Sequence, residues 1–539
     1  MPEIDLIVLS GAPTPTSWGL GRVYVCPPEP EAVRTALAEA SHRGRYLFVW
    51  DSRLGFPDSA AVKRTAGLPG DAWHAGLCLG LRRLPQAIDF VDPVWMLNRD
   101  SDSGIVSSSW RLSLRCCLLS PRCLIPLAAG FDSLDAAGLE LGHRLIKSGA
   151  VLRHVPGLAS GAARLPSPAL TLQDEMKFLA LRYGVKWLCY AAARMAMSGY
   201  AAVKDILVAT RAASKLTRPE VSDRFKAPAP IANAAGVVSV LIPTIDRYVY
   251  LEKLLPQLQA QTRPALEIVI VDQTHPSRRR QIATPDGPTT IRVLTLDRSG
   301  QCTSRNAGLL QVKGDCVLFL DDDDEVQPDL IERHLANLEM FRADVSAGVA
   351  DEVGAGPLPA DFRFLRVSNV FPTNNAMIRR RTLEHSGLFD LAYDKGQRAD
   401  GDLGMRMYLA GALMILNPEI SVFHHHAPMG GLRTHKARKI TYASSRQSIW
   451  QRHLPSATEI YLMRRYYDRI QMREALWQRA IGTLSASGSV PRRMAKAVVA
   501  LIMMPDTVRR IRAVCREGDL MTAEYPRIPK LGAAFEASV

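Results

Sequence analysis

Five acidic residues, Asp321 to Glu325, follow directly after the apolar run Val317 to Leu320, which predicts a buried strand. Carboxylates this close repel one another unless a cation lies among them. The carboxyl end of a strand is also where open α/β sheets bind ligands. Carboxylate oxygens favour Mg²⁺ or Mn²⁺, ions that commonly take phosphate oxygens from a substrate as well. The alternative is an exposed acidic turn, or a helix N-terminus, where negative charge is stabilised.

Two further carboxylates lie within Arg398 to Arg406, at the predicted start of an apolar-periodic helix. Asp400 is expected in or just before the first turn, where it can point into a cleft, and Asp402 follows two positions later. A carboxylate in this place can accept the proton of a hydroxyl as a general base. Both residues are therefore candidate catalytic groups. Capping of the helix by either residue is the alternative.

Three consecutive histidines, His424 to His426, follow a predicted short strand, Ile420 to Phe423. Alternate side chains of a strand point the same way, so His424 and His426 are expected to share a face. Imidazole nitrogen suits Mn²⁺, which makes these two histidines candidate metal ligands beside Asp321 and Asp323. Solvated loop histidines are the alternative.

The candidate donor-binding residues stand at the ends of predicted elements: Pro243, Thr244, Asp272, Arg305, Asn306, Asp321 and Asp322. The first two end one strand, the third ends the next strand, and the following pair begins a helix. Because the carboxyl ends of neighbouring parallel strands meet at one edge of a sheet, a nucleotide base and a diphosphate can dock there.

These residues lie in a strand–helix alternation that covers residues 237–430. Strands are predicted at 237–242, 266–271, 291–296 and 316–320, and helices at 250–260 and 304–312. Such alternation predicts an α/β domain built on a mainly parallel sheet with helices on both faces.

The rest of the chain has a different character. Residues 1–165 alternate short apolar runs with turn residues, residues 166–236 predict a helical segment and a linker, and residues 431–539 predict a basic helical region. The chain also repeats itself weakly, because Gly130-Phe131-Asp132 recurs as Gly387-Leu388-Phe389-Asp390 with similar residues after each copy. We therefore expect two domains of one architecture.

In order, the segments of residues 237–430 resemble the family 2 glycosyltransferases, which have the GT-A fold. The resemblance is carried by Val238–Thr244, Ile268–Asp272, Ser304–Gly308, Gly314–Asp324, Pro328–Asp329, Asn375–Arg379, Gly387–Asp390 and Ala399–Arg406. One departure is Ala399, where the family usually has Glu or a similar residue. The aspartate that the family uses as its base is kept as Asp400.

The resemblance implies a nucleotide-diphosphate sugar as donor and an inverting transfer to an acceptor hydroxyl. It implies Mg²⁺ or Mn²⁺ held by Asp323, with Asp321 and Asp322 nearby, and Asp400 as the base. His424 lies near the place where many members have a metal-binding histidine. The acceptor stays open among a glycan, a lipid-linked sugar and a protein.

The first domain resembles the same fold in a degraded form. Ser52 replaces the presumed metal ligand, and Gly138 stands opposite Asp400. The short span up to Asp51 leaves little room for a half that binds a nucleotide base. We therefore predict that residues 1–165 do not catalyse transfer and serve as a structural partner or an acceptor-binding module.

The net charge of +14 comes mostly from residues 431–539, which hold 20 Lys and Arg against 8 Asp and Glu. A basic region favours an anionic partner. We expect peripheral contact with anionic lipid through Arg492 to Arg512, a segment that mixes apolar and basic residues, or else helix packing onto the catalytic domain. No nucleic-acid-binding motif is present, so no nucleic-acid partner is predicted.

Nine cysteines without metal-type or redox-type spacing indicate a reducing compartment. The first residues do not resemble a signal peptide, and no apolar run approaches the roughly 20 residues of a spanning helix. A cytoplasmic location, with peripheral contact at the inner face of the membrane, is the expectation. Two other functions stay open. A nucleotidyltransferase is disfavoured because no Gly-rich phosphate loop follows the first strand, and a non-catalytic nucleotide-sugar-binding scaffold because Asp321–Asp324 and Asp400 are intact.

Overall fold

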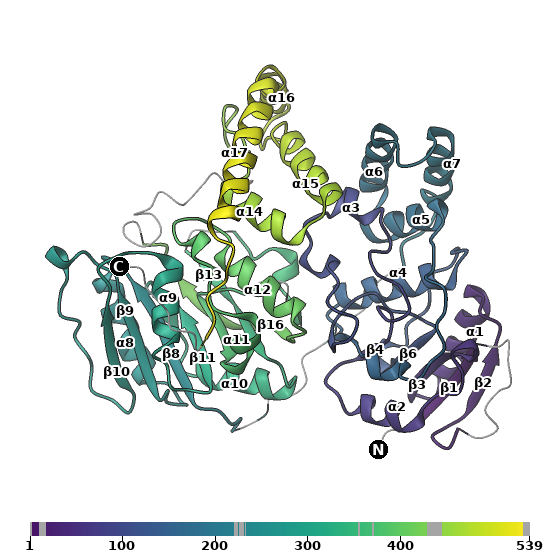
Figure 1. Cartoon of the computed structure of the whole chain (residues 1–539), viewed down its shortest axis with the longest axis horizontal. Helices are drawn as coiled ribbons and strands as arrows, with labels where there is room; N and C mark the ends of the chain where they lie inside the picture. Colours follow the sequence, from purple (N-terminus) through teal and green to yellow (C-terminus); the bar gives the residue numbers. More distant parts are fainter. Residues whose placement is uncertain are drawn as a thin grey trace.

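The computed structural model contains two β-sheets, each covered by helices, and a group of C-terminal helices beside them (Figure 1). It describes residues 3–9, 18–219, 225, 231, 233–353, 356–368, 371–427 and 445–531. The predicted linker at 227–236 and the start of the basic region at 431–444 lie largely outside the described residues. We call residues 3–165 the first unit and residues 237–427 the second unit.

The first unit is built on a seven-stranded sheet in the order β2-β1-β3-β6-β4-β7-β5. Its strands are β1 (Ile4–Leu9), β2 (Val23–Cys26), β3 (Tyr46–Asp51), β4 (Ala72–His74), β5 (Ser107–Ser108), β6 (Cys116–Leu119) and β7 (Leu152–His154). Its helices are α1 (Pro30–Ser41), α2 (Ser59–Ala66), α3 (Ile88–Val91) and α4 (Leu134–Lys147). The predicted helical segment follows as α5 (Leu172–Tyr183), α6 (Val185–Ser198) and α7 (Val203–Ala213).

The second unit is built on a nine-stranded sheet in which β10-β9-β8-β11-β15-β13-β16-β12 is the order and β14 pairs with β16. Its strands are β8 (Val238–Thr244), β9 (Glu267–Asp272), β10 (Thr290–Thr295), β11 (Cys316–Leu320), β12 (Asp324–Val326), β13 (Val345–Glu352), β14 (Arg366–Val367), β15 (Asn375–Arg379) and β16 (Met414–His424). Its helices are α8 (Tyr248–Gln259), α9 (Gln301–Leu309), α10 (Leu330–Met340), α11 (Arg381–Ser386) and α12 (Ala399–Leu409).

The parallel order that the sequence predicts holds for β10, β9, β8 and β11. Beyond β11 the sheet is mixed, because β15 runs antiparallel to both β11 and β13. The all-apolar strand β11 is buried along its whole length, as expected for a central strand covered on both faces. Its carboxyl end therefore delivers the acidic residues to one edge of the sheet.

The two sheets share one topology. The order β2-β1-β3-β6-β4-β7-β5 corresponds, strand for strand, to β9-β8-β11-β15-β13-β16-β14 in the second unit. The relative directions also agree: β1 and β3 are parallel as β8 and β11 are, and β6 is antiparallel to β3 as β15 is to β11. Helix α4 lies between β6 and β7 in the chain, as α12 lies between β15 and β16.

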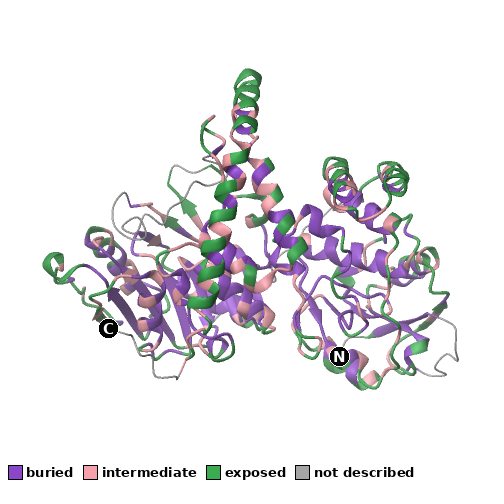
Figure 2. Cartoon of the chain, turned by 45° about the horizontal axis from the view of Figure 1, so that its top comes forward, coloured by how far each residue is buried: buried purple, intermediate pink, exposed green. Residues whose placement is uncertain are grey.

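Four C-terminal helices follow: α14 (Ala457–Tyr466), α15 (Arg469–Gly482), α16 (Val490–Ile502) and α17 (Met504–Glu524). Helix α14 bonds to the second unit through Tyr466 and Asp402, α15 contacts α3 of the first unit, and α16 contacts α17. Capping boxes at Ser456 and Asp468 fix the starts of α14 and α15. Glu474 on α15 pairs with Arg194 on α6 through two hydrogen bonds of 2.9 and 3.0 Å, and both side chains are buried. Figure 2 shows the buried residues concentrated in the two sheets and the helices against them, and the exposed ones on α16 and on the ends of α6 and α7.

Candidate functional site

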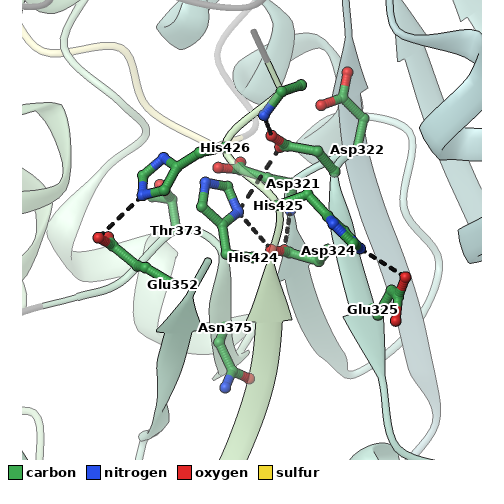
Figure 3. Close-up of polar contacts among 12 residues, drawn as sticks. Asp321, Asp322, Asp324, Glu325, Glu352, Thr373, Asn375, His424, His425 and His426 are labelled. Atoms are coloured by element: carbon green, nitrogen blue, oxygen red, sulfur yellow. Dashed lines mark hydrogen bonds and ion pairs between the residues drawn. The ribbon is translucent and has the colours of Figure 1, made fainter. Parts of the chain in front are cut away.

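Three carboxylates lie in the turn that joins β11 to β12, and a histidine lies across from them. Strand β12 pairs antiparallel with β16, in a register that sets Asp324 opposite His424. This pairing brings His424 to the turn, where ligand atoms of Asp321, Asp323 and His424 all lie within 4.8 Å of one another. Figure 3 shows Asp321 and His424 close together at the end of the sheet.

Hydrogen bonds from outside the turn fix the aspartates. Arg247 donates to Asp322 and to Asp323 at 2.9 Å each, and Thr244 donates to Asp322 at 2.7 Å. The other oxygen of Asp323 accepts from the backbone N–H of Ala427 at 2.7 Å. The cluster is therefore held in one arrangement by contacts from β8, from the start of α8 and from the segment after β16.

Burial shapes the protonation of this cluster. It raises the pKa of Asp322 to about 7, against the opposing effect of Arg247, and it raises the pKa of Asp324 to about 8, against that of His424. Burial alone would lower the pKa of His424, but the hydrogen bond to Asp324 and the surrounding carboxylates raise it to about 9. A cation that binds here would therefore displace protons from these groups.

The donor set fits a hard or borderline divalent ion. Asp321 and Asp323 supply carboxylate oxygens and His424 supplies an imidazole nitrogen, a combination that suits Mn²⁺ and tolerates Mg²⁺. Asp324 lies beside this set and accepts from His424 Nδ1 at 2.8 Å, while its second oxygen accepts from the backbone N–H of Asp321. Asp324 thus orients the histidine and closes the turn.

His426, the other predicted metal ligand, lies beside this group and pairs elsewhere. The strand ends at His424, and His426 has a φ of 53°, so the alternation of side chains does not continue to it. Its ring lies 4.7 Å from that of His424 but its Nε2 pairs with Glu352 at 3.0 Å. His425 pairs with Glu325 at 2.6 Å on the other side of the strand (Figure 3).

The predicted donor-binding residues differ in how close they lie to the acidic cluster. Asp272, at the end of β9, accepts from Tyr248 at 2.7 Å and from the backbone N–H of Thr274 at 2.9 Å. Arg305 donates to Asp321 at 3.0 Å, so it lies directly at the cluster. Pro243 is half-buried within β8, next to Thr244.

Asn306 does not face the cluster, although the sequence places it among the donor-binding residues. Its amide group donates to the carbonyl of Phe389 at 2.8 Å and accepts from the backbone N–H of the same residue at 2.9 Å. The side chain is fully buried. Asn306 therefore clamps α9 to the segment before α12, which is a structural role.

Asp402, the second predicted catalytic group, is bonded on both sides within the protein. It is fully buried, pairs with Arg406 at 2.8 Å and accepts from Tyr466 at 2.7 Å. Through these two contacts its carboxylate joins α12 to α14. A buried acid with this many donors has no free position toward a substrate.

Asp400 is half-buried at the start of α12 and lines a cavity of about 220 Å³. The cavity lies between the two units and the C-terminal helices, and its lining residues are Val94, Met96, Arg398, Asp400, Gly401, Met405, Glu459, Leu462, Met463, Tyr467 and Arg479. Asp321, Asp323 and His424 are not among them. The shared cleft that the sequence predicts for Asp323 and Asp400 is therefore not formed by this cavity.

Helix α9 connects the two places. Its Arg305 holds Asp321, while the backbone N–H groups of Cys302 and Thr303 at its start donate to Asp394 at 2.8 Å each. Asp394 lies only a few residues before Asp400 in the chain.

Sequence reasoning missed Arg247 and Tyr248, which contact Asp323 and Asp272. Both stand just after the first strand of the second unit, in the stretch where a phosphate or base contact is expected. The signal in the sequence was a single arginine, Arg247, shortly after this predicted strand.

The aspartates of the cluster lie within residues that match a known protein family. Residues 239–387 match the family model Glycosyl transferase family 2. Within the second unit, these residues are therefore similar to the family 2 glycosyltransferases. Together with the sheet topology, this match confirms the predicted α/β fold class of the GT-A type.

Individual relatives are similar to the same domain. The uncharacterized glycosyltransferase YwdF of Bacillus subtilis is 30% identical over 167 residues, which are 28% of this chain and 62% of YwdF. The GalNAc(5)-diNAcBac-PP-undecaprenol beta-1,3-glucosyltransferase of Campylobacter jejuni is 33% identical over 101 residues, which are 16% of this chain and 30% of that protein. The chain thus spans less than two thirds of these relatives.

Among solved structures, the mannosyltransferase PcManGT of Pyrobaculum calidifontis, in complex with GDP-Man and Mn²⁺, is similar with a TM-score of 0.35 and 18% identity. The similarity covers 56% of this chain and 90% of PcManGT. TarS of S. aureus in complex with UDP has a TM-score of 0.31 and 17% identity, covering 51% of this chain and 73% of that one.

Proposed function

We propose that this protein is a metal-dependent, inverting glycosyltransferase that moves a sugar from a nucleotide-diphosphate donor to an acceptor hydroxyl. The observation that supports the proposal best is the meeting of Asp321, Asp323 and His424 within 4.8 Å at the carboxyl end of β11, where the two aspartates lie within the residues that match the family 2 model. The two aspartates come from the turn before β12 and the histidine from β16, so the site forms only when these strands pair. Polysaccharide or glycoconjugate synthesis is the process in which such a transfer belongs.

In this proposal the donor lies along the ends of β8, β9 and β11. Asp272 accepts from the nucleotide base, and Arg305, next to Asp321, contributes positive charge for the phosphates. Asp321, Asp323 and His424 hold Mg²⁺ or Mn²⁺, and such an ion, when bound, neutralises charge on a diphosphate leaving group. Arg247 balances Asp322 and Asp323 before the donor arrives.

Asp400 is the proposed general base. It takes the proton of the acceptor hydroxyl, and that oxygen attacks the anomeric carbon from the face opposite the nucleotide. The bond between the anomeric carbon and the phosphate oxygen breaks, so the nucleoside diphosphate leaves and the configuration inverts. Within the described residues Asp400 forms no ion pair, although it interacts electrostatically with Arg398.

The cavity beside Asp400 is the proposed site for the acceptor. Its apolar wall includes Met405 and Tyr467, and its charged groups include Arg398 and Glu459, which pair with each other at 2.6 Å. A sugar has both apolar faces and hydroxyl groups, so a wall of mixed character suits it. Val94 and its neighbour Met96 come from the first unit, which gives that unit a part in acceptor binding.

We propose that residues 1–165 are a GT-A-like domain without catalysis, joined by residues 166–236 to a catalytic domain at 237–430 and a basic helical region at 431–539. The matching strand order of the two sheets supports this division. At the end of β3, Asp51 accepts from Arg53 at 2.7 Å and from Arg115 at 2.8 Å. Two guanidinium groups thus take the place that a metal ion would need.

A cytoplasmic location with peripheral contact at the inner face of the membrane belongs to the same proposal. The acceptor is a glycan, a lipid-linked sugar or a protein. Among the described residues, no helix is both long and apolar enough to cross a bilayer.

Hydrolysis of nucleotide-diphosphate sugars tests the proposal most directly. UDP-, GDP- and ADP-sugars are incubated with the full chain in Mn²⁺, in Mg²⁺ and in EDTA, and the nucleotide product is identified. Release of a nucleoside diphosphate that requires the metal supports glycosyl transfer. With pyrophosphate added, formation of a nucleoside triphosphate and a sugar 1-phosphate identifies a nucleotidyltransferase, and donor binding without turnover identifies a non-catalytic scaffold.

A further inference from the structure

Helix α16 turns its apolar residues away from the protein. Its large apolar side chains are between 55% and 74% exposed: Val490, Met494, Val498, Leu501 and Ile502. They recur at intervals of three or four residues, which places them on one side of the helix. An ordinary surface helix presents the opposite pattern, with its apolar side against the core.

The inward side of α16 is polar where it meets the protein. Lys496 is buried, and its ammonium group donates to the backbone carbonyls of Ser445 at 3.2 Å, Ser448 at 2.8 Å and Gln451. This charged group anchors the helix by three hydrogen bonds. The orientation of α16 is therefore set by its lysine, and the exposure of its apolar side is a consequence of that anchor.

An exposed tryptophan stands beside this side of the molecule. Trp450 is 65% exposed and lies between Ser448 and Gln451, the residues that hold Lys496. Tryptophan is enriched at the boundary between lipid and water because its ring is apolar and its N–H is polar. Its position next to the α16 anchor extends the apolar surface.

Positive charge adjoins the apolar side. Helix α16 contains Arg492, Arg493 and Lys496 and no acidic residue. Arg512 and Arg516 on α17 are exposed, and along with Arg493 they form no ion pair within the part of the chain that the structure describes. Apolar side chains flanked by arginines match a bilayer surface that carries anionic headgroups.

A second group of exposed apolar residues lies on α6 and α7. The ends of these helices lie on the same side of the molecule as α16 in both views (Figures 1 and 2). Met197, Val203, Leu207 and Val208 on these helices are between 56% and 68% exposed.

We infer that the outward side of α16, with Trp450 and the neighbouring arginines, docks onto an anionic lipid bilayer. A second copy that pairs its α16 in parallel fits less well, because that contact would bring Arg492 and Arg493 of both copies together. The bilayer offers headgroup phosphates to these arginines and acyl chains to Val498 and Ile502. This docking surface does not depend on the proposed transfer reaction.

Sedimentation with vesicles tests the inference on the full chain. Vesicles of phosphatidylcholine alone and with 30 mole per cent phosphatidylglycerol, about a third anionic lipid, are compared as probes of the surface charge. The variant V498D/I502D places two carboxylates on the outward side of α16. The control V25D/F56D changes two residues of closely similar exposure in the first unit, 52% and 74% against 55% and 74%.

The wild-type chain and the control are expected to sediment with anionic vesicles, and V498D/I502D to bind them at least about tenfold more weakly. Binding is also expected to fall in 0.5 M NaCl, about three times physiological ionic strength. The inference is overturned if the wild type stays in the supernatant with both vesicles, or if V498D/I502D sediments as the wild type does. Light scattering that shows a wild-type dimer and a monomeric V498D/I502D would also overturn it, by identifying a second copy as the occupant.

Discussion

Arg247 donates a 2.9 Å hydrogen bond to Asp323, one of the three groups proposed to hold the metal ion. The same guanidinium nitrogen also donates to Asp322 at 2.9 Å. Arg247 is therefore the counter-ion of the cluster in the free protein. A divalent ion at Asp323 must share this carboxylate with Arg247 or displace it, since two cations a few ångströms apart repel.

Replacing Arg247 with Gln is expected to tighten Mn²⁺ binding to the free chain roughly tenfold, because a competing charge is lost. In EDTA the same variant is expected to lose about 3 kcal/mol of unfolding free energy, the usual result of leaving a buried charge without its partner. Electron paramagnetic resonance of Mn²⁺ measures the first effect and thermal unfolding the second. R278Q removes only the exposed ion pair with Asp246 and is the control. Unchanged Mn²⁺ affinity in R247Q would contradict this role.

Replacing Asp323 with Ala is expected to remove metal-dependent donor binding. The loss should exceed the roughly 10- to 100-fold that follows from losing an outer-shell partner of a metal site. Calorimetry with a hydrolysable donor, in Mn²⁺ and in EDTA, measures it. The matched change D329A removes an exposed acid that pairs with Arg333 outside the cluster and should leave binding intact. Equal donor affinity in D323A and the wild type would remove Asp323 from the ligand set.

Replacing Asp400 with Asn is expected to keep donor binding and to lower transfer by about 10²- to 10⁴-fold, the usual contribution of a general base. D402N, two residues away, should instead lower stability, because Asp402 holds Arg406 and Tyr466 inside the protein. Steady-state transfer and thermal unfolding, measured on both variants, separate the two roles. Normal turnover by D400N would show that another group takes the proton.

Much of the second unit follows from its sequence. The predicted strand Cys316 to Leu320 is observed with the same bounds, and the first predicted helix differs by only one or two residues at each end. Apolar runs and periodicity are local properties, so they are readable from the chain alone. Strands β13 to β15 were not predicted, because their positions depend on pairing with distant segments.

The candidate site was readable in part for the same reason. A carboxylate at the end of a strand can be placed from sequence, as the meeting of Asp321 and Asp323 with His424 illustrates. The sequence alone does not tell whether a polar side chain faces a ligand or bonds to the backbone of the protein. Asn306 and Asp402 carry the residue types of a site, yet both are used to join elements.

Filling the cavity between the units tests its role in acceptor binding. M96W is expected to lower transfer to an acceptor while metal-dependent donor hydrolysis stays within about twofold of wild type, since the donor residues lie elsewhere. Overpacking should cost about 1–3 kcal/mol of stability. M197W, at an exposed position on α6, is the control. Loss of donor hydrolysis in M96W, at unchanged folding, would show that the cavity serves the donor.

His334 gives a stability test that depends on pH. Its buried ring bonds Ser346 and Asn375 at 2.8 Å each, and burial lowers its pKa from 6.5 to about 4. The unfolded chain binds the proton more readily, so stability is full above pH 6.5 and is lost as pH falls toward 4. H334Q should be about 1–3 kcal/mol less stable than wild type at pH 7.5. The difference should shrink by roughly 2 kcal/mol at pH 5, because only the wild type pays for keeping this ring neutral. Chemical unfolding at both pH values measures this difference in stability. The other histidines are the same in both proteins, so their contributions cancel. A difference that stays constant with pH would show that His334 does not titrate as its burial requires.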